Sequence, residues 1–189
     1  PPSLADRLML VRTHLEAGDT LAAEQAMQTI LPVELETADL DDKTSHIALG
    51  VRLDGEGGAA RFAARSAGMV AAELGLSASV DVVLAAIALG DADTARSVSW
   101  KLFEKGTIRP VFAQLREAFA SGGLENDFRD MQKRAALERI ASAKPGAEAP
   151  ADAPVAQDTS APQAAPEVDE GADAPQGVET PAAGERPAD

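Results

Sequence analysis

The residues with the clearest capacity for chemistry form an acidic cluster, Asp39, Asp41 and Asp42, which is followed by His46. Carboxylates beside an imidazole can hold a hard divalent cation and activate a water molecule for hydrolysis. Only one histidine lies in this region, and acids at the start of a helix are also stabilised by the helix dipole. The cluster therefore suits the N-terminus of a helix that begins at Lys43. We predict this structural role, with a metal-dependent hydrolase as the alternative.

Other catalytic patterns find little support in this sequence. Residues 54–58, Asp-Gly-Glu-Gly-Gly, are not followed by the Lys-Ser or Lys-Thr of a phosphate-binding loop and lack the spaced acids of a calcium loop. The chain has no cysteine and two histidines, which excludes thiolate chemistry and leaves few bases to activate a serine. The sequence therefore predicts a protein that is not an enzyme and that uses no metal and no cofactor.

The charge balance argues against several kinds of partner. The chain has 31 Asp and Glu against 17 Lys and Arg, a net charge of −14, which repels phosphate backbones and anionic lipid headgroups. No apolar run approaches the roughly 20 residues that a membrane-spanning helix needs. We therefore expect no nucleic-acid partner, no direct membrane insertion and a cytoplasmic location. The chain starts at Pro1 without a methionine, so the alternative is a processed or truncated protein that is periplasmic or membrane-tethered.

The composition changes abruptly near Ala143. Residues 143–189 contain eight of the twelve prolines and ten acidic residues, and their only sizeable apolar side chains are three valines. Such a segment cannot bury enough apolar surface to offset the roughly 1–2 kcal/mol per residue that backbone ordering costs. We therefore predict a helical domain over residues 1–142 and a disordered, acidic Pro/Ala-rich tail over residues 143–189.

Within the predicted domain, apolar residues recur every three or four positions, which is the spacing of an amphipathic helix. The first such stripe follows a candidate N-cap at Ser3 and consists of Leu4, Leu8, Val11 and Leu15. Alternation typical of strands does not occur. The sequence therefore predicts an all-α fold.

Glycine-containing breaks divide these helices at a nearly regular interval. Gly18, Gly55, Gly90 and Gly123 are separated by 37, 35 and 33 residues, a period that indicates repeated helix–turn–helix units. One helix pair cannot bury its apolar side alone, whereas stacked pairs share a continuous core. The second unit is the least regular, because a long acidic connection over residues 32–42 precedes it.

Two of the turns have a similar sequence. Residues 15–26 (Leu-Glu-Ala-Gly-Asp-Thr-Leu-Ala-Ala-Glu-Gln-Ala) and residues 86–95 (Ala-Ile-Ala-Leu-Gly-Asp-Ala-Asp-Thr-Ala) share a Gly-Asp turn with a small residue five positions after the glycine. In this feature the chain resembles the tetratricopeptide repeat (TPR) family. The resemblance implies a right-handed solenoid of about four antiparallel helix pairs, with small residues where the helices of a pair approach closely: Ala23, Ala60 and Ala95. The fourth unit departs from the pattern and has Phe128 at that position.

The TPR resemblance also implies a binding surface, because proteins of that family bind peptides in a groove lined by the first helix of each pair. Carried over to this chain, that placement predicts a partner-binding site formed by Leu8, Arg12, Leu49, Arg52, Val80, Leu84 and Ile87. The groove would bury the apolar anchors of a peptide or amphipathic helix while an arginine pairs with a carboxylate. The alternative is that the apolar members are ordinary core between the repeats.

These features together predict a scaffold for protein–protein interaction, an adaptor or chaperone-like module that binds a peptide or helix of another protein. The alternative is a structural subunit that docks into a larger assembly through its convex face or its end repeats.

Aromatic residues are concentrated near the predicted third and fourth units. Trp100, Phe103 and Phe112 flank the connection over residues 106–110, and we expect them to pack the junction, with an exposed aromatic as a candidate anchor for a partner. The last predicted helix, residues 124–142, has many charges opposite one apolar stripe of Leu124, Phe128, Met131 and Ala135. This arrangement predicts a terminal cap with a polar outer face.

Overall fold

Helices make up all the regular secondary structure of the described residues. The computed structural model describes residues 2–54 and 56–143, and these form ten α-helices, one 3-10 helix and no strand. The all-α prediction is confirmed for these residues. The predicted disordered tail, residues 143–189, lies outside the described residues except for Ala143.

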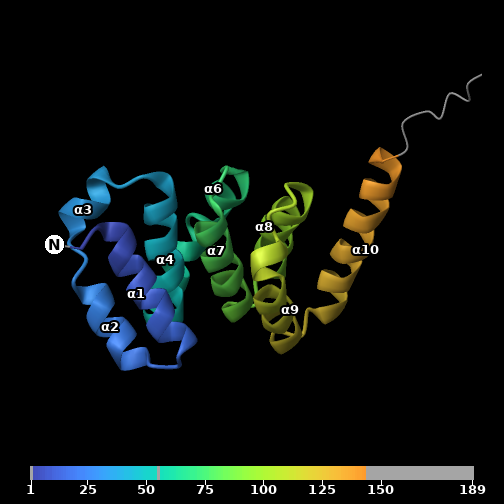
Figure 1. Cartoon of the computed structure of the whole chain (residues 1–189). Helices are drawn as coiled ribbons and strands as arrows, with labels where there is room; N and C mark the ends of the chain where they lie inside the picture. The colour runs from blue at the N-terminus through green and yellow to red at the C-terminus, as the bar shows by residue number, and fades with distance from the viewer. Residues whose placement is uncertain (1, 55, 144–189) are drawn as a thin grey trace, which may run out of the picture. The chain divides into compact units, whose positions relative to one another are not determined.

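The described residues belong to one compact unit, in which the helices follow one another in chain order (Figure 1). The helices are α1 Leu4–Glu16, α2 Thr20–Gln28, α3 Pro32–Thr37, α4 Leu40–Asp54, α5 Glu56–Ala63, α6 Ser66–Ala71, α7 Leu76–Ala88, α8 Ala92–Glu104, the 3-10 helix η1 Arg109–Val111, α9 Phe112–Ser121 and α10 Glu125–Ser142.

Helices pack in pairs within this unit. α1 contacts α2, α4 contacts α5, α7 contacts α8, and α9 contacts α10. The first helices of the pairs also contact one another, α1 with α4, α4 with α7, and α7 with α9. The row formed by α1, α4, α7 and α9 carries the residues of the candidate site.

Three turns between paired helices use the same local geometry. Gly18, Gly90 and Gly123 have φ angles of +75°, +71° and +73°, a left-handed conformation that glycine adopts without steric cost. The N–H of the residue after each glycine donates to a carbonyl five residues earlier, at N–O distances of 2.8, 2.8 and 2.7 Å. Asp19 and Asp91 then cap the next helix, because each carboxylate accepts from a backbone N–H three residues later at 3.0 Å. Each Gly-Asp pair therefore ends one helix and starts another.

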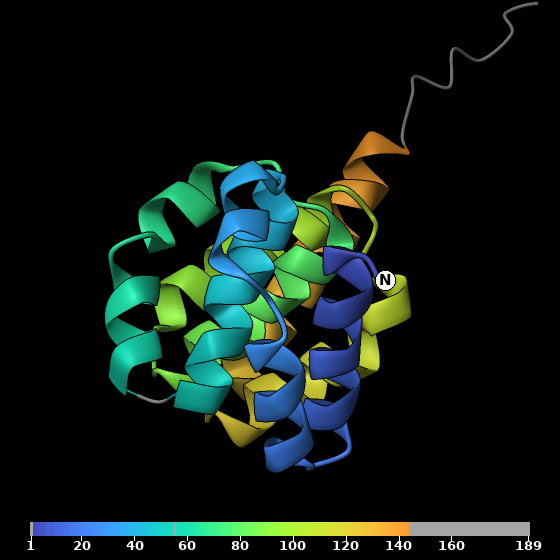
Figure 2. The same cartoon turned by 90° about the vertical axis from the view of Figure 1, so that its left-hand side faces the viewer.

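The second unit contains helices that the sequence did not predict. α3 lies within the acidic connection, where Pro32 at the first helical position has a φ angle already suited to a helix. The Glu34 carboxylate also accepts from the Leu31 N–H at 2.9 Å. The second half of this repeat unit is divided into two short helices, α5 and α6, rather than forming one. Figure 2 shows the described helices from the end at which α1, α2 and α3 lie.

The close approach in the second unit occurs at Gly58 and not at the predicted Ala60. A Cβ on Gly58 would lie 2.6 Å from the Gly50 carbonyl oxygen, so α5 packs directly against the backbone of α4. Ala60 is exposed, whereas Ala23 and Ala95 are fully buried as expected. The expectation for Ala60 was wrong because the glycine-rich turn offers a smaller residue two positions earlier.

Two clusters of buried apolar side chains hold the helices together. The smaller cluster joins α1, α2 and α4 through Leu8, Val11, Ala23, Ala26, Ile30 and Leu49. The larger runs from α4 to α10, and in it the Phe128 ring centroid lies 5.5 Å from that of Phe103 and 5.2 Å from that of Phe119. Full burial of a side chain of this size contributes about 1.5–3 kcal/mol. Phe128, which departs from the TPR pattern, is therefore a core residue.

Candidate partner-binding cleft

Four of the seven predicted site residues line one cleft. Arg12, Arg52, Val80 and Leu84 meet in a cleft of about 130 Å³ between α1, α4, α7 and α9. We call it the Arg52 cleft, and its remaining lining residues are Glu16, Leu76, Ser77, Asp81, Val111 and Gln114. The row of first helices thus brings together residues that are 72 positions apart in the chain, from Arg12 to Leu84.

The other three predicted residues lie elsewhere. Leu8 and Leu49 are fully buried in the core that joins α1, α2 and α4, so they do not line an open surface. Ile87 is half-buried and packs against the C-terminal end of α9, where a Cβ on Gly122 would lie only 2.5 Å from Ile87 Cγ2. The prediction of an open lining does not hold for these residues, because helical spacing alone does not separate the side of a helix facing its neighbours from the side facing solvent.

Arg12 lies in the Arg52 cleft, but its guanidinium group already has partners within the chain. Its Nε donates to Asp81 Oδ1 and Oδ2 at 3.0 and 2.8 Å, and its Nη2 donates to Ser45 Oγ at 2.9 Å. Asp81 is only 2% exposed, and burial raises its pKa, although the hydrogen bonds and charge of Arg12 act in the opposite direction. The ion pair joins α1 to α7, and the hydrogen bond to Ser45 joins α1 to α4. Arg12 therefore has a structural role, and the predicted role as a ligand for a partner's carboxylate does not fit its contacts.

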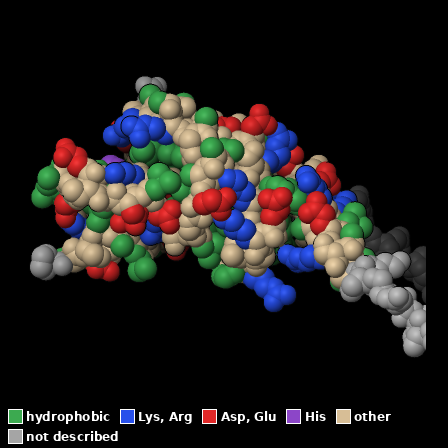
Figure 3. All heavy atoms as spheres, turned by 90° about the horizontal axis from the view of Figure 1, so that it is seen from above, with side chains coloured by type: hydrophobic (Ala, Val, Ile, Leu, Met, Phe, Trp, Pro, Cys, Tyr) green, Lys and Arg blue, Asp and Glu red, His purple; other side chains and the backbone are tan. Residues whose placement is uncertain are grey.

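Arg52 differs from the other half-buried Lys and Arg side chains of the described residues, all of which donate to a partner within the chain. On the face seen in Figure 3, Lys and Arg side chains lie among Asp and Glu side chains. Arg52 is half-buried and forms no side-chain hydrogen bond or ion pair with another described residue. Burial lowers the pKa of its guanidinium group, and the charges of Asp81 and Glu16 only partly oppose that effect. Arg52 is thus a half-buried cation whose side chain donates to no other described residue.

The shape and lining of the Arg52 cleft suit one side chain rather than a cofactor. Sites for small molecules usually have volumes of roughly 300–1,000 Å³, well above the volume of this cleft. Half-buried Leu84 provides apolar surface beside Arg52, whereas Val80 is 6% exposed and belongs mainly to the core. Gln114 donates to Glu16 across the cleft at 3.1 Å. A guanidinium group offers a planar set of donors that matches a carboxylate. The cleft can therefore hold a carboxylate that has an apolar neighbour.

The acidic residues Asp39 and Asp41 each accept a hydrogen bond from a different backbone N–H group and do not converge on one site. Asp39 Oδ1 accepts from the Asp42 N–H at 2.8 Å at the start of α4, and Asp41 accepts from the Gly75 N–H at 3.0 Å. α4 therefore begins at Leu40, three residues before the predicted start, and Asp41 ties it to the start of α7. Among the described residues, no three His, Cys, Asp or Glu side chains are grouped so that they could hold a metal ion.

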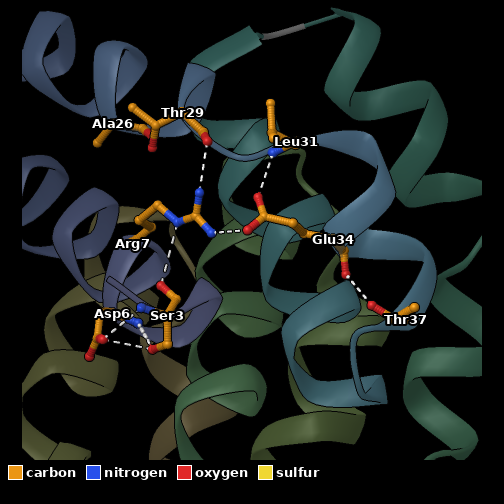
Figure 4. Close-up of polar contacts among 8 residues, drawn as sticks. All are labelled: Ser3, Asp6, Arg7, Ala26, Thr29, Leu31, Glu34 and Thr37. Carbon is orange, nitrogen blue, oxygen red and sulfur yellow. Dashed lines mark hydrogen bonds and ion pairs between the residues drawn. The ribbon is translucent and has the colours of Figure 1, made fainter. Parts of the chain in front are cut away.

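The sequence analysis did not predict the polar contacts that hold α3 against α1. Arg7 forms an ion pair with Glu34 and donates through Nη1 to the Thr29 carbonyl at 2.9 Å (Figure 4). Hydrogen bonding to Arg7 lowers the pKa of Glu34. Next to Arg7, Ser3 Oγ accepts from the Asp6 N–H at 3.1 Å, which confirms the predicted N-cap of α1. The sequence signal that could have indicated α3 is Pro-Val-Glu after Leu31, a helix start with an acid at its third position.

Comparison with known proteins finds no match to this chain. No family model, curated protein or solved structure matches the chain. Within residues 2–54 and 56–143, no helix is both long and apolar enough to cross a membrane.

Proposed function

We propose that the helical unit is a TPR-like scaffold that binds a segment of another protein in the Arg52 cleft. The TPR-like part of the proposal is supported by the contacts of α1, α4, α7 and α9, which place the first helices of four pairs in one row. It is also supported by the repeated geometry of the turns at Gly18, Gly90 and Gly123. In this role the protein acts as an adaptor or chaperone-like module.

The observation that carries the binding proposal is half-buried Arg52, which has no hydrogen-bond or ion-pair partner among the described residues and lies beside apolar Val80 and Leu84. A charged group loses hydration on burial, and that cost is recovered only when a partner of opposite charge supplies hydrogen bonds. The recognised segment is therefore an extended or helical peptide with an Asp, a Glu or a free C-terminal carboxylate next to an apolar residue.

Selection of binding peptides tests this proposal with a defined ligand. A random peptide library is selected on the full chain and counter-selected on an Arg52→Glu variant, and the dissociation constants of the selected peptides are then measured. A hydrogen bond to a charged group is worth about 1.5–3 kcal/mol, so Arg52→Glu should weaken binding at least about tenfold. Arg65→Glu is the matched control, because Arg65 is exposed and is not one of the residues that line the cleft.

Arg12 must be left unchanged in this experiment, because its replacement would disturb the ion pair with Asp81. If the selected peptides contain no carboxylate near an apolar residue, or if Arg52→Glu and Arg65→Glu weaken binding equally, the Arg52 cleft is not the binding site.

A further inference from the structure

A pocket between α2, α4 and α5 shares no lining residue with the Arg52 cleft. Its volume is about 330 Å³, at the lower end of the roughly 300–1,000 Å³ of sites that bind small molecules. His46, Gly50 and Leu53 contribute to it from α4, and their spacings of four and three residues place them on one side of that helix. We call this space the His46 pocket.

A glycine within α4 leaves part of the His46 pocket open. Gly50 lies inside a 15-residue helix, where glycine is less favourable than any residue except proline. A Cβ on Gly50 would meet only the Arg61 side chain within 4 Å, at an ordinary contact distance of 3.9 Å. Gly58 differs, because a Cβ there would collide with the backbone of α4. Close packing therefore does not require a glycine at position 50, and the absent side chain adds open space to the pocket.

The lining of the His46 pocket includes one carboxylate without a partner in the described chain. Its titratable or charged residues are Glu24, His46, Asp54 and Arg61. Asp54 and Arg61 form an ion pair at 2.9 Å, so their charges offset one another. Glu24 is half-buried, and its carboxylate forms no hydrogen bond or ion pair with another described residue.

The imidazole of His46 adds no positive charge to the pocket at neutral pH. It is half-buried, and burial and the charge of Arg61 lower its pKa, so the imidazole is uncharged at pH 7. Its side chain also has no hydrogen-bond partner among the described residues. Two carboxylates and one guanidinium group therefore leave the pocket with one net negative charge.

These groups favour a ligand that is positive at one end and apolar at the other. The Glu24 carboxylate accepts N–H donors, and a neutral imidazole accepts one more through its unprotonated nitrogen. Half-buried Met27 and Leu53 provide apolar surface in the same pocket. An anion fits poorly, because Glu24 repels it and Arg61 already pairs with Asp54.

We propose that the His46 pocket binds a small organic ammonium, an amine with a short apolar body, whose N–H groups donate to Glu24. The apolar body packs against Met27 and Leu53, in the space that Gly50 leaves open. This proposal does not depend on the proposed binding of a peptide in the Arg52 cleft. A lysine side chain of a polypeptide carries the same ammonium group, so the experiment includes an arm for that source.

The test compares probes that share a phenylethyl body and differ in the head group. They are 2-phenylethylammonium, neutral 2-phenylethanol and the anion 3-phenylpropanoate, and a blocked tripeptide with a central lysine is the fourth probe. Each is titrated at pH 7 into the full chain with carbon-13 in its methionine methyl groups, and the Met27 signal is assigned with Met27→Leu. Met9 is 63% exposed and does not line the pocket, so its methyl signal is the internal reference.

The ammonium probe should shift the Met27 signal saturably and leave the Met9 signal in place. Its dissociation constant should be at least about tenfold lower than those of the alcohol and the carboxylate. Glu24→Gln keeps the shape of the side chain and removes its charge, so it should weaken ammonium binding at least about tenfold. Glu117→Gln is the matched control, because Glu117 is exposed and does not line the pocket. This control and Arg52→Glu should both bind the ammonium probe as the wild type does.

Gly50→Leu tests the open space itself. Leucine favours a helix more than glycine does, so this variant should keep or raise the midpoint of urea denaturation while it loses binding of the ammonium probe. Should the variant be less stable than the wild type, the comparison of Glu24→Gln with Glu117→Gln still decides the proposal.

Several results would overturn the proposal. Equal binding of the three head groups would remove the role of charge, and equal effects of Glu24→Gln and Glu117→Gln would remove Glu24 as the acceptor. A lysine tripeptide that binds more tightly than the free amine would assign the pocket to a polypeptide. A Met27 signal that stays in place with every probe would show that the pocket accepts no such ligand.

Discussion

Replacing Arg12 by methionine tests the energetic role of its ion pair with Asp81, which joins α1 to α7, and of its hydrogen bond to Ser45 on α4. The variant leaves the Asp81 carboxylate buried without its cation, and removing one partner of a buried pair costs about 3–5 kcal/mol. Since the Arg12 side chain is 20% exposed, water compensates in part, and we expect a loss of about 3 kcal/mol in the free energy of unfolding. Urea denaturation followed by circular dichroism measures this loss. Arg129→Met, which removes an exposed pair with Glu125, should cost less than about 1 kcal/mol.

The pH dependence of the Arg12→Met effect gives an independent check. Burial holds the pKa of Asp81 above its ordinary value in the folded protein, and loss of Arg12 removes the main opposing interaction and raises this pKa further. A group whose pKa is raised on folding destabilises the folded state above that pKa, and the penalty disappears as the pH falls through it. The difference between variant and wild type should therefore be largest near pH 7 and shrink on acidification. A difference that is constant with pH, or a loss as small as that of Arg129→Met, would refute the reasoning.

Three further predictions concern single residues. Gly58→Ala should destabilise the protein by about 1–3 kcal/mol in urea denaturation, because its Cβ would lie 2.6 Å from a carbonyl oxygen. The control Gly68→Ala should be neutral or stabilising by up to about 1 kcal/mol, because a Cβ there meets nothing within 4 Å. Equal effects of the two substitutions would contradict the close contact between α4 and α5. Gly90→Ala should cost about 1–2 kcal/mol because φ there is +71°, and an unchanged midpoint would argue against the left-handed turn. Burial and the charge of Arg61 lower the pKa of His46 in the folded protein. The free energy of unfolding should therefore fall as the pH drops from about 6.5 through that lowered pKa. The His46→Gln variant should lack this part of the pH dependence of the free energy of unfolding.

The features that the sequence predicted best are local ones. A glycine followed by an aspartate specifies a left-handed residue and a helix cap within the same few residues, so the turns at Gly18 and Gly90 could be located without knowledge of the fold. The N-cap at Ser3 was predictable for the same reason. The position of the close helix contact, Gly58 instead of Ala60, was not predictable because it depends on the packing of α5 against α4.

The candidate site was predicted only in part, because contacts distant in sequence decide which residues are available. The partner of Arg12 is Asp81, 69 residues away, and nothing local distinguishes Arg12 from an arginine exposed to solvent. The same periodicity placed Leu8 and Leu84 in one group, although the first is fully buried core and the second is half-buried and lines the Arg52 cleft. The predicted buried stripe of α10 includes Phe128, Met131 and Ala135 as expected, but the predicted polar outer face was only partly correct, because Leu137 and Ile140 are exposed there.

The central claim, that Arg52 binds a partner's carboxylate, is tested most directly by nuclear magnetic resonance of the Arg52 side chain. The Nε–Hε signal of Arg52 is assigned by comparison with Arg52→Lys and followed during titration with a selected peptide and with a version in which its carboxylate is replaced by an amide. We predict that the Arg52 signal shifts with the acidic peptide and stays in place with the amide version. A peptide that binds and shifts other signals while the Arg52 signal stays unchanged would contradict the account.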